Sequence, residues 1–127
     1  MTWCISLKPE YASAIMEGRK KIEVRTRLPK YLSGGDRVFV CVTGTKGKIP
    51  FSFKVAWWGM GRPKRTWRLF KKDMCVSLSE FDRYTSGRSW VCLMGIENVQ
   101  ICYHPLSVDE LGLKTSPLWF ARVSKEV

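Results

Sequence analysis

Long apolar runs are missing from this chain of 127 residues, in which the longest extend over only a few positions. A membrane-spanning helix needs about 20 consecutive apolar residues, so the sequence predicts none. The first ten residues, MTWCISLKPE, also lack the order of basic, long apolar and small residues that marks a signal peptide. We therefore expect a cytoplasmic protein without membrane contact.

Histidine and closely spaced cysteines are also scarce. The chain has one histidine, His104, and no two of its five cysteines are close enough to make a CxxC-type pair. A zinc site needs several such ligands brought together, so we predict no metal, and no motif requires a cofactor. Cys4, Cys41, Cys92 and Cys102 lie in apolar stretches, where a reduced thiol behaves as a small hydrophobic group. We expect these four thiols in the core.

Acidic residues are few. The sequence has 11 Asp and Glu against 22 Lys and Arg, which gives a net charge of +11 and a pI near 9.7. A field of this sign attracts polyanions, and nucleic acid is the commonest polyanion in a cytoplasm. Many small basic proteins are merely soluble, however, so charge alone leaves nucleic-acid binding undecided.

What the sequence does contain fits one α+β domain over residues 1–127, with 45% hydrophobic residues to form a single core. Apolar patterning and β-propensity predict four strands and a helix, and Ser-x-x-Glu capping boxes predict two more short helices. Strands are expected at 2–8, with Trp3, Ile5 and Leu7 on one face, at 21–27, at 37–43, and at 51–58, with Phe51, Phe53, Val55 and Trp57 on one face. Helices are expected at 9–17, where Tyr11, Ala12, Ile15 and Met16 form an apolar stripe, and from 77 and 107. Residues 89–103 form two strands or one long bent strand, and 117–123 a last strand. This order predicts a curled mixed sheet or small barrel with helices at its openings.

The segment EGRKKIEVRTR, residues 17–27, carries seven charges in eleven residues. In a strand, alternate side chains share a face, so Lys21, Glu23, Arg25 and Arg27 are expected to point the same way. Glu23 could simply neutralise its neighbours in salt bridges. Exposed ion pairs contribute only ~0 to 1 kcal/mol each, so stability is a weak reason for this concentration of charge.

The same segment can be written Gly-x-Lys-x-x-Glu-x-Arg, filled by Gly18, Lys20, Glu23 and Arg25, and it resembles the signature of the ASCH domain. SLKPEYASAIMEG before it is similar to the strand, Lys-Pro and helix that precede this signature in the family. LSEFDRYTSG and TSPLWF resemble the helix near its cleft and its last strand. The match is specific over residues 4–43, plausible over 77–123 and absent between. It implies a PUA-like mixed β-barrel with short helices flanking a cleft.

The resemblance further implies a cleft that takes RNA or a nucleotide-like ligand, with Lys20, Glu23 and Arg25 at its floor. A carboxylate beside cations stays ionised and can accept hydrogen bonds from an exocyclic amine such as cytosine N4. Arg25 and Lys20 would hold phosphate or carbonyl oxygens. Arg27 completes the cationic set as the last charge of the strand. The resemblance assigns Ser6 and Lys8 to the cleft. It also places Tyr84 and Trp119 near the cleft, while the residues themselves leave open whether each of these two rings lines the cleft or packs in the core.

The alternative function is a small metal-independent hydrolase, either a ribonuclease or a modified-nucleoside amidohydrolase, using Lys20 and Glu23 with assistance from Tyr84. Some ASCH relatives resemble amidohydrolases acting on acetylated cytidine, with a threonine nucleophile where this chain has Glu23. A carboxylate attacking an amide would give a high-energy anhydride. Neighbouring cations also lower the pKa that a general base needs raised. The residues therefore favour binding and leave turnover open.

A second candidate surface is RPKRTWRLFKK, residues 62–72, with six cations and no acid. Such a mixture can clamp phosphates while a ring stacks on an unpaired base. The cations are Arg62, Lys64, Arg65, Arg68, Lys71 and Lys72. Alternatively, the stretch is a solvated hairpin that Trp67 and Phe70 anchor to the core; Phe70 fits this anchoring role better, and Trp67 fits both roles. A third possibility is that this basic loop docks an acidic protein.

Overall fold

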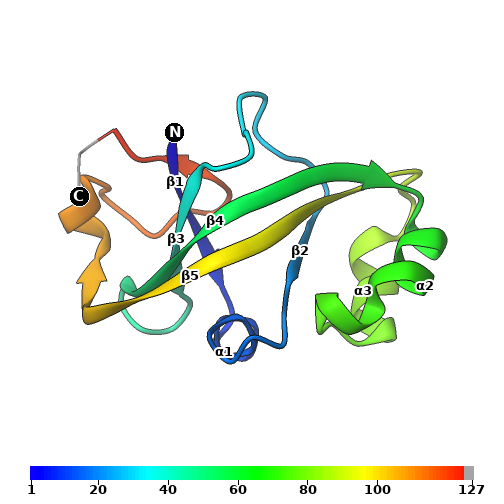
Figure 1. Cartoon of the computed structure of the whole chain (residues 1–127), viewed down its shortest axis with the longest axis horizontal. Coiled ribbons are helices and arrows are strands. Elements are labelled where there is room, and N and C mark those ends of the chain that lie inside the picture. The colour runs from blue at the N-terminus through cyan, green and yellow to red at the C-terminus, as the bar shows by residue number, and fades with distance from the viewer. Residues whose placement is uncertain (125–127) are drawn as a thin grey trace.

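The structure, a computed structural model, describes residues 1–124. Within this range, six strands form a mixed sheet that curls into a half-barrel with three α-helices around it (Figure 1). The strands are β1 (Thr2–Leu7), β2 (Ile22–Arg25), β3 (Arg37–Val42), β4 (Lys48–Gly61), β5 (Val91–Ser107) and β6 (Ala121–Arg122). The helices are α1 (Pro9–Met16), α2 (Pro63–Met74) and α3 (Leu78–Thr85), and a 3-10 turn, η1 (Val108–Leu111), follows β5. The predicted α+β class is confirmed.

The strand order is β2-β5-β4-β3-β1-β6, in which β1 and β3 are parallel and the other neighbours antiparallel. Strands β4 and β5 run side by side across the molecule, and α2 and α3 connect the end of β4 to the start of β5 (Figure 1). Strand β5 is a single element of 17 residues. Of the two alternatives for residues 89–103, the single long strand is therefore observed.

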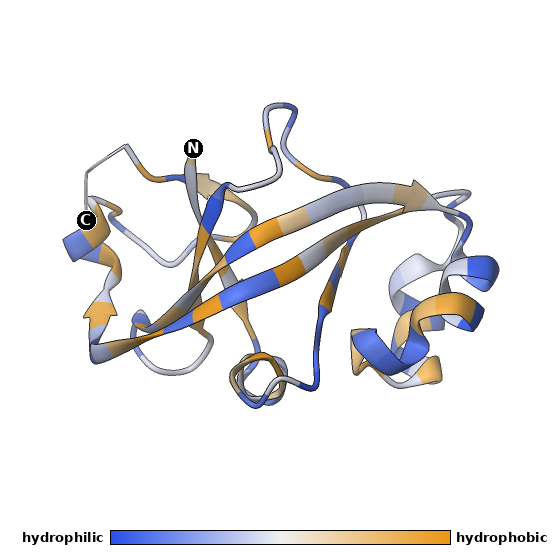
Figure 2. Cartoon of the chain, in the orientation of Figure 1, coloured by the Kyte–Doolittle hydropathy of each residue, from blue (hydrophilic) through white to orange (hydrophobic). Residues whose placement is uncertain are grey.

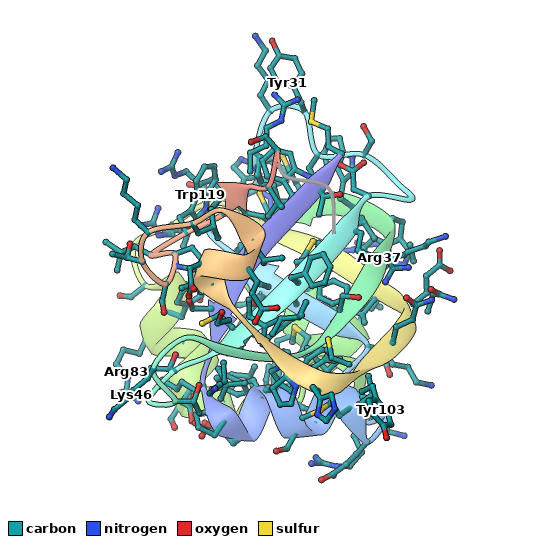
Figure 3. All side chains as sticks on the ribbon, turned by 90° about the vertical axis from the view of Figure 1, so that its left-hand side faces the viewer. Tyr31, Arg37, Lys46, Arg83, Tyr103 and Trp119 are labelled. Atoms are coloured by element: carbon teal, nitrogen blue, oxygen red, sulfur yellow. The ribbon has the colours of Figure 1, made fainter. Side chains whose placement is uncertain are left out.

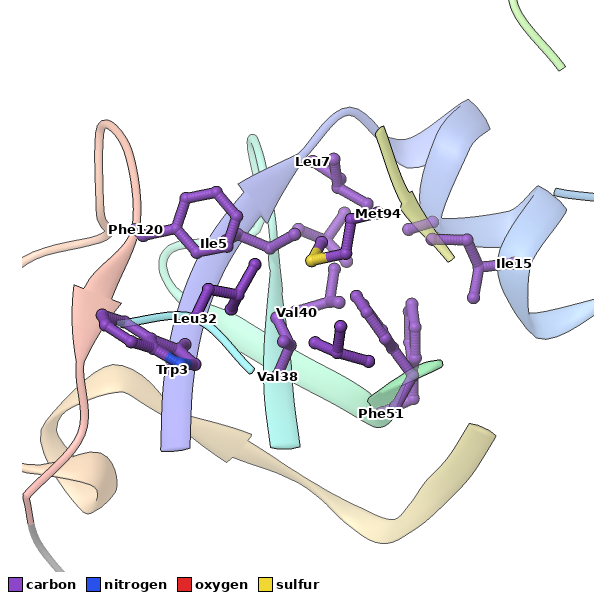
Figure 4. Close-up of a cluster of buried hydrophobic side chains, with 14 residues drawn as sticks. Trp3, Ile5, Leu7, Ile15, Leu32, Val38, Val40, Phe51, Met94 and Phe120 are labelled. Atoms are coloured by element: carbon purple, nitrogen blue, oxygen red, sulfur yellow. The ribbon is translucent and has the colours of Figure 1, made fainter. Parts of the chain in front are cut away.

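The main core fills the half-barrel. Alternation along β1 turns Trp3, Ile5 and Leu7 inward, as predicted, and they are buried together (Figure 4). The other elements contribute further buried side chains, including Ile15, Leu32, Val38, Val40, Phe51, Phe53, Met94 and Phe120. This packing fixes the end of β1 and the start of α1 beside β2, where the candidate site lies.

The hairpin alternative for the basic stretch is wrong, because residues 63–74 form helix α2. Pro63 occupies the first turn, where its missing N–H costs no hydrogen bond. Trp67, Phe70 and Met74 recur every three or four residues and so share one face. That face packs over β2 and β5 in a separate core cluster, while the lysines and arginines of the helix are exposed. Hydrophilic and hydrophobic residues accordingly alternate along α2 (Figure 2).

Trp57 departs from its expected place beside Phe51 and Phe53 in the main core. The β4–β5 register shifts between Val55 and Trp58, and this irregularity changes the face on which the following residues lie. Trp57 instead packs against Phe70 of α2, with ring centroids 6.2 Å apart. It lies so close to Gly95 that a Cβ there would come within 2.4 Å of the indole nitrogen. Glycine is therefore required at this point of β5.

The last strand is shorter than predicted. Only Ala121–Arg122 pair with β1, and the preceding residues of 117–123 form a loop. Pro117 has no backbone N–H to give to a sheet, which explains why the strand begins after it. Ser77 and Ser107 do cap α3 and η1 as their capping boxes predicted.

The thiols follow the prediction with one exception. Cys4, Cys41 and Cys92 are buried, but Cys102 is half-exposed because it lies on β5 beyond the main core. Burial raises the pKa of the Cys4 thiol to about 12, so this thiol stays protonated and unreactive. Separately, none of the helices in residues 1–124 combines the length and apolar character that crossing a membrane requires.

Candidate functional site

A cleft of about 590 Å³ opens between the half-barrel and α3. The end of β1 and the start of α1 form one wall, α3 forms the other, and β2 forms the floor. The polar and aromatic lining residues are Ser6, Lys8, Tyr11, Lys20, Glu23, Arg25, Thr43, Glu80, Phe81, Arg83 and Tyr84. The cleft thus brings together six residues singled out from the sequence: Ser6, Lys8, Lys20, Glu23, Arg25 and Tyr84.

The floor of the cleft is a buried ionic cluster of Lys20, Glu23 and Arg25. Lys20 Nζ lies 3.5 Å from Glu23 Oε1, and Arg25 Nε donates a hydrogen bond of 2.8 Å to Glu23 Oε2. Lys20 is 2% exposed and Glu23 is 6% exposed. One carboxylate is thus held by a cation at each oxygen, away from bulk water but at the surface of the cleft.

The turn after α1 explains why Lys20 rather than Lys21 is the cation beside Glu23. Gly18 takes a left-handed conformation with φ of 81°, and the backbone N–H of Lys20 returns to the carbonyl of Ala14. Lys20 then points inward, while Lys21 is exposed and its N–H donates to Asp73 O. The expectation that Lys21 belongs to one ionic face with Glu23 is wrong, because the strand begins only at Ile22.

The ammonium group of Lys20 contacts other groups of the protein besides Glu23. Its ammonium donates a hydrogen bond of 2.6 Å to Met74 O at the end of α2. It also lies 5.3 Å from the centre of the Tyr11 ring, a favourable cation–π position. Lys20 therefore positions Glu23 and ties it to α2, in addition to lining the cleft.

The electrostatic balance keeps Glu23 ionised. Burial alone raises the pKa of this carboxyl, but the charges of Arg25 and Lys20 and their hydrogen bonds outweigh it, so the pKa is lowered overall. Arg25 is fixed in turn: its Nη2 donates to Ser6 O at 3.3 Å, and its guanidinium lies 5.4 Å from the Phe120 ring centre. The site presents a permanent, preorganised hydrogen-bond acceptor.

The wall formed by α3 brings Glu80 and Tyr84 to the cleft, and each of them makes a hydrogen bond to another part of the chain. Tyr11 Oη donates a hydrogen bond to Glu80 across the cleft, and burial together with this bond raises the pKa of Tyr11. Tyr84 Oη accepts from the Thr26 backbone N–H at 3.0 Å. Tyr11 belonged to an apolar helix stripe and Glu80 to a capping box. Patterns in the sequence carry no signal that these two residues face each other.

Arg27 and Trp119 lie outside this lining but contact each other. The guanidinium of Arg27 sits 4.0 Å from the centre of the Trp119 ring, and Trp119 Nε1 donates to the Arg27 carbonyl at 3.3 Å. Trp119 also packs on Phe120 at the edge of the main core. The pair forms a cationic and aromatic surface near the cleft rather than a part of its floor.

Five cations of the basic stretch lie on α2, and Arg62 directly precedes the helix. All six are exposed, and within residues 1–124 none of them forms an ion pair: Arg62, Lys64, Arg65, Arg68, Lys71 and Lys72. Trp67 packs against Phe81, with ring centroids 5.4 Å apart, and Phe70 joins the same cluster. Both rings thus serve as anchors, and the helix offers charge rather than a free stacking ring at these positions.

The sequence and fold of the chain are similar to those of known proteins. The family model of the ASCH domain matches residues 5–112, which includes the basic stretch where the sequence resemblance was absent. The solved ASCH protein of Zymomonas mobilis is 21% identical, with a TM-score of 0.88 over 98% of this chain and 88% of that chain. A serine-to-alanine variant of that protein gives a TM-score of 0.87 at 21% identity, covering 98% and 89% of the two chains. No curated protein matches the chain. The structural likenesses show a shared fold.

Proposed function

This chain belongs to the ASCH domain family, and from that membership we propose that it binds RNA or another single-stranded nucleic acid in the cleft around Glu23. ASCH domains are associated with RNA binding as a family. The site here is proposed to select one base, while cations around it hold the backbone.

The observation that carries the proposal is the ionised carboxylate buried at the cleft floor. A carboxylate has about four acceptor positions on its two oxygens, so Glu23 can accept further hydrogen bonds while Lys20 and Arg25 remain in place. An acceptor of this kind pairs with an exocyclic amine such as cytosine N4. Because Glu23 is shielded from bulk water, a hydrogen bond to it is stronger than at an exposed position.

The distribution of charge supports a polyanionic partner. Net charge is +11, and the α2 cations have no carboxylate partners within residues 1–124. Phosphate contacts of this type fix a strand without selecting its sequence. The proposal thus separates the task of the cleft, which is selection, from the task of the helix surface, which is affinity.

The same geometry argues against general-base catalysis by Glu23. A general base works best with a pKa near the operating pH, whereas the pKa of Glu23 is lowered by Arg25 and Lys20. The Lys20 ammonium is occupied by Met74 O and Glu23, and Tyr84 Oη is occupied by Thr26. These contacts favour a cluster of Lys20, Glu23 and Arg25 whose charges stay fixed rather than one that transfers protons.

The test is Glu23→Gln, with Glu97→Gln as the matched control because Glu97 is exposed on β5. Glutamine keeps the shape of glutamate but replaces one acceptor oxygen by the NH2 donor of an amide. Binding of oligonucleotides that differ at one base should lose its base preference by about tenfold, or 1.4 kcal/mol, with a smaller change in mean affinity. Thermal melts verify that both variants fold. Equal losses for every base would contradict selection by Glu23.

Turnover is tested separately. Pure protein is incubated with labelled RNA and with acylated nucleosides in the presence of a chelator, and products are followed by chromatography. We expect no turnover. Product formation that disappears in Lys20→Met, at a temperature where thermal melts show this variant to be folded, would establish the hydrolase instead.

A further inference from the structure

A second hollow of about 620 Å³ adjoins the cleft. One side is the turn between β3 and β4, with Gly44, Lys46 and Gly47, and the other is the segment from Lys114 to Leu118. The two sides meet closely at Gly47, where an added Cβ would lie 3.7 Å from Ser116 Oγ.

The two cavities lie next to each other. Ser6 and Thr43 line both of them, so the second hollow begins where the wall of the cleft ends. Ser6 Oγ donates a hydrogen bond of 2.8 Å to Pro117 O, which fixes the far side of the hollow to β1. In the view of Figure 3, which looks along the long axis of Figure 1, Lys46 and Arg83 project on the same side, opposite Arg37 and Tyr103. A ligand that passes over Ser6 and Thr43 would therefore reach from one cavity into the other.

The chemistry of the two cavities differs in a way that suits two parts of one ligand. The cleft is lined by the carboxylates of Glu23 and Glu80 as well as by cations, so it offers both acceptors and donors. The second hollow is lined by Lys46 and Lys114 together with hydroxyl groups, and its lining within the described chain contains no acidic residue. A base needs partners of both kinds, whereas a phosphate needs donors and positive charge only.

The turn itself supplies more donors. Within residues 1–124, the backbone N–H groups of Gly44, Lys46 and Gly47 make no hydrogen bond to the protein. All three residues have left-handed φ values, between 57° and 84°. Backbone N–H groups of this kind, beside two lysines and the Ser116 hydroxyl, are typical donors for an anion.

We propose that the second hollow is a phosphate subsite, which holds the phosphate of the nucleotide whose base lies in the cleft. The inference rests on the proposed function for its biological setting, because it names the second part of the same ligand. It assigns Lys46 and Lys114 as phosphate-binding residues.

The first experiment probes the hollow without any base. Inorganic phosphate is titrated into the full chain, and backbone amide resonances are followed by NMR. The signals of Gly44, Lys46, Gly47 and Ser116 should shift together and saturate. Lys46→Ala/Lys114→Ala should abolish the saturation, whereas the control Lys48→Ala/Lys54→Ala, with the same loss of charge at exposed positions of β4, should keep it. Binding by adventitious charge would affect both double variants equally and would overturn the proposal.

The second experiment adds the base. Calorimetry compares ribonucleosides with their 3′- and 5′-monophosphates. One of the two monophosphates should bind about tenfold more tightly than its nucleoside, and the Lys46/Lys114 variant should lose that gain. A nucleoside that binds, with no gain from either phosphate, would refute the subsite and leave the cleft function intact. Phosphate that saturates the hollow while no nucleoside binds would support the subsite and refute the base-selecting cleft.

Discussion

Two groups of cations in this small protein have opposite surroundings. Lys20 and Arg25 are enclosed by the fold, and each of them contacts Glu23 and a backbone carbonyl. The cations of α2 face solvent and are without ion pairs in the part of the chain that the structure describes. The difference shows that lysine and arginine have two separate roles in this protein, which depend on whether they are buried or exposed. The enclosed pair builds a defined site, and the exposed set supplies a field.

Energetics follow the same division. Removing one partner from a buried ion pair leaves an uncompensated charge, which costs several kcal/mol, while an exposed charge contributes little to folding. Exposed charges act instead on association, through a field that salt screens. Three changes test whether this division is real.

The largest effect is expected for Lys20→Met, which keeps the length of the side chain but removes its charge. Glu23 would then remain buried with Arg25 alone, and Met74 O would lose its donor. We expect the free energy of unfolding to fall by about 3 kcal/mol in urea titrations. The neighbouring Lys21→Met should change it by less than about 0.5 kcal/mol, because Lys21 is exposed. Similar losses for both would show that burial does not separate the two groups.

An intermediate effect is expected from acid. The folded pKa of Glu23 lies below its ordinary value of 4.5, so the stability from its ionised form is complete above that pH and is lost as pH falls through the folded pKa. The free energy of unfolding of Glu23→Gln should therefore fall less steeply below pH 4.5 than that of the native chain. The difference in slope corresponds to up to about one proton taken up on unfolding. The pKa of Asp36 is also lowered, by the N-terminus and Trp3 acting against burial, so both proteins retain that part of the dependence. Identical slopes in urea titrations across this range would contradict the assignment.

The smallest effect on folding is expected for Arg65→Gln/Arg68→Gln on α2. Unfolding should change by less than about 0.5 kcal/mol, because both side chains face solvent. The dependence of single-strand binding on salt should nevertheless flatten, by about 0.7 in the log–log slope for each phosphate that the variant no longer neutralises. An unchanged slope would remove α2 from the binding surface.

Much of the fold could be predicted from local patterns. Strong alternation in β1 and the Pro and Gly residues around α1 fix these elements with little help from the rest of the chain. Helix α2 was not predicted, because six cations obscured an apolar stripe that becomes clear only once β2 and β5 provide a surface for it. Trp57 was misplaced because a β-bulge shifts register without a signature in the sequence.

The site was predictable in part for similar reasons. Glu23 and Arg25 lie two apart on a strand, so their shared face follows from alternation. Lys20 joins them through the turn at Gly18, and Glu80 joins Tyr11 through tertiary packing of α3, which no local spacing encodes. The second hollow depends on segments about seventy residues apart in the sequence, so only the assembled fold brings Lys46 to Lys114.

The last turn of α2 accepts two hydrogen bonds from the residues just before β2. Lys20 Nζ donates to the carbonyl of Met74, and the N–H of Lys21 donates to that of Asp73. Carbonyls at the end of a helix carry partial negative charge, which strengthens both bonds. A polyanion bound to the outside of α2 would therefore act, through these two bonds, on the lysine that holds Glu23 in place, so a load on the helix would be felt at the floor of the cleft.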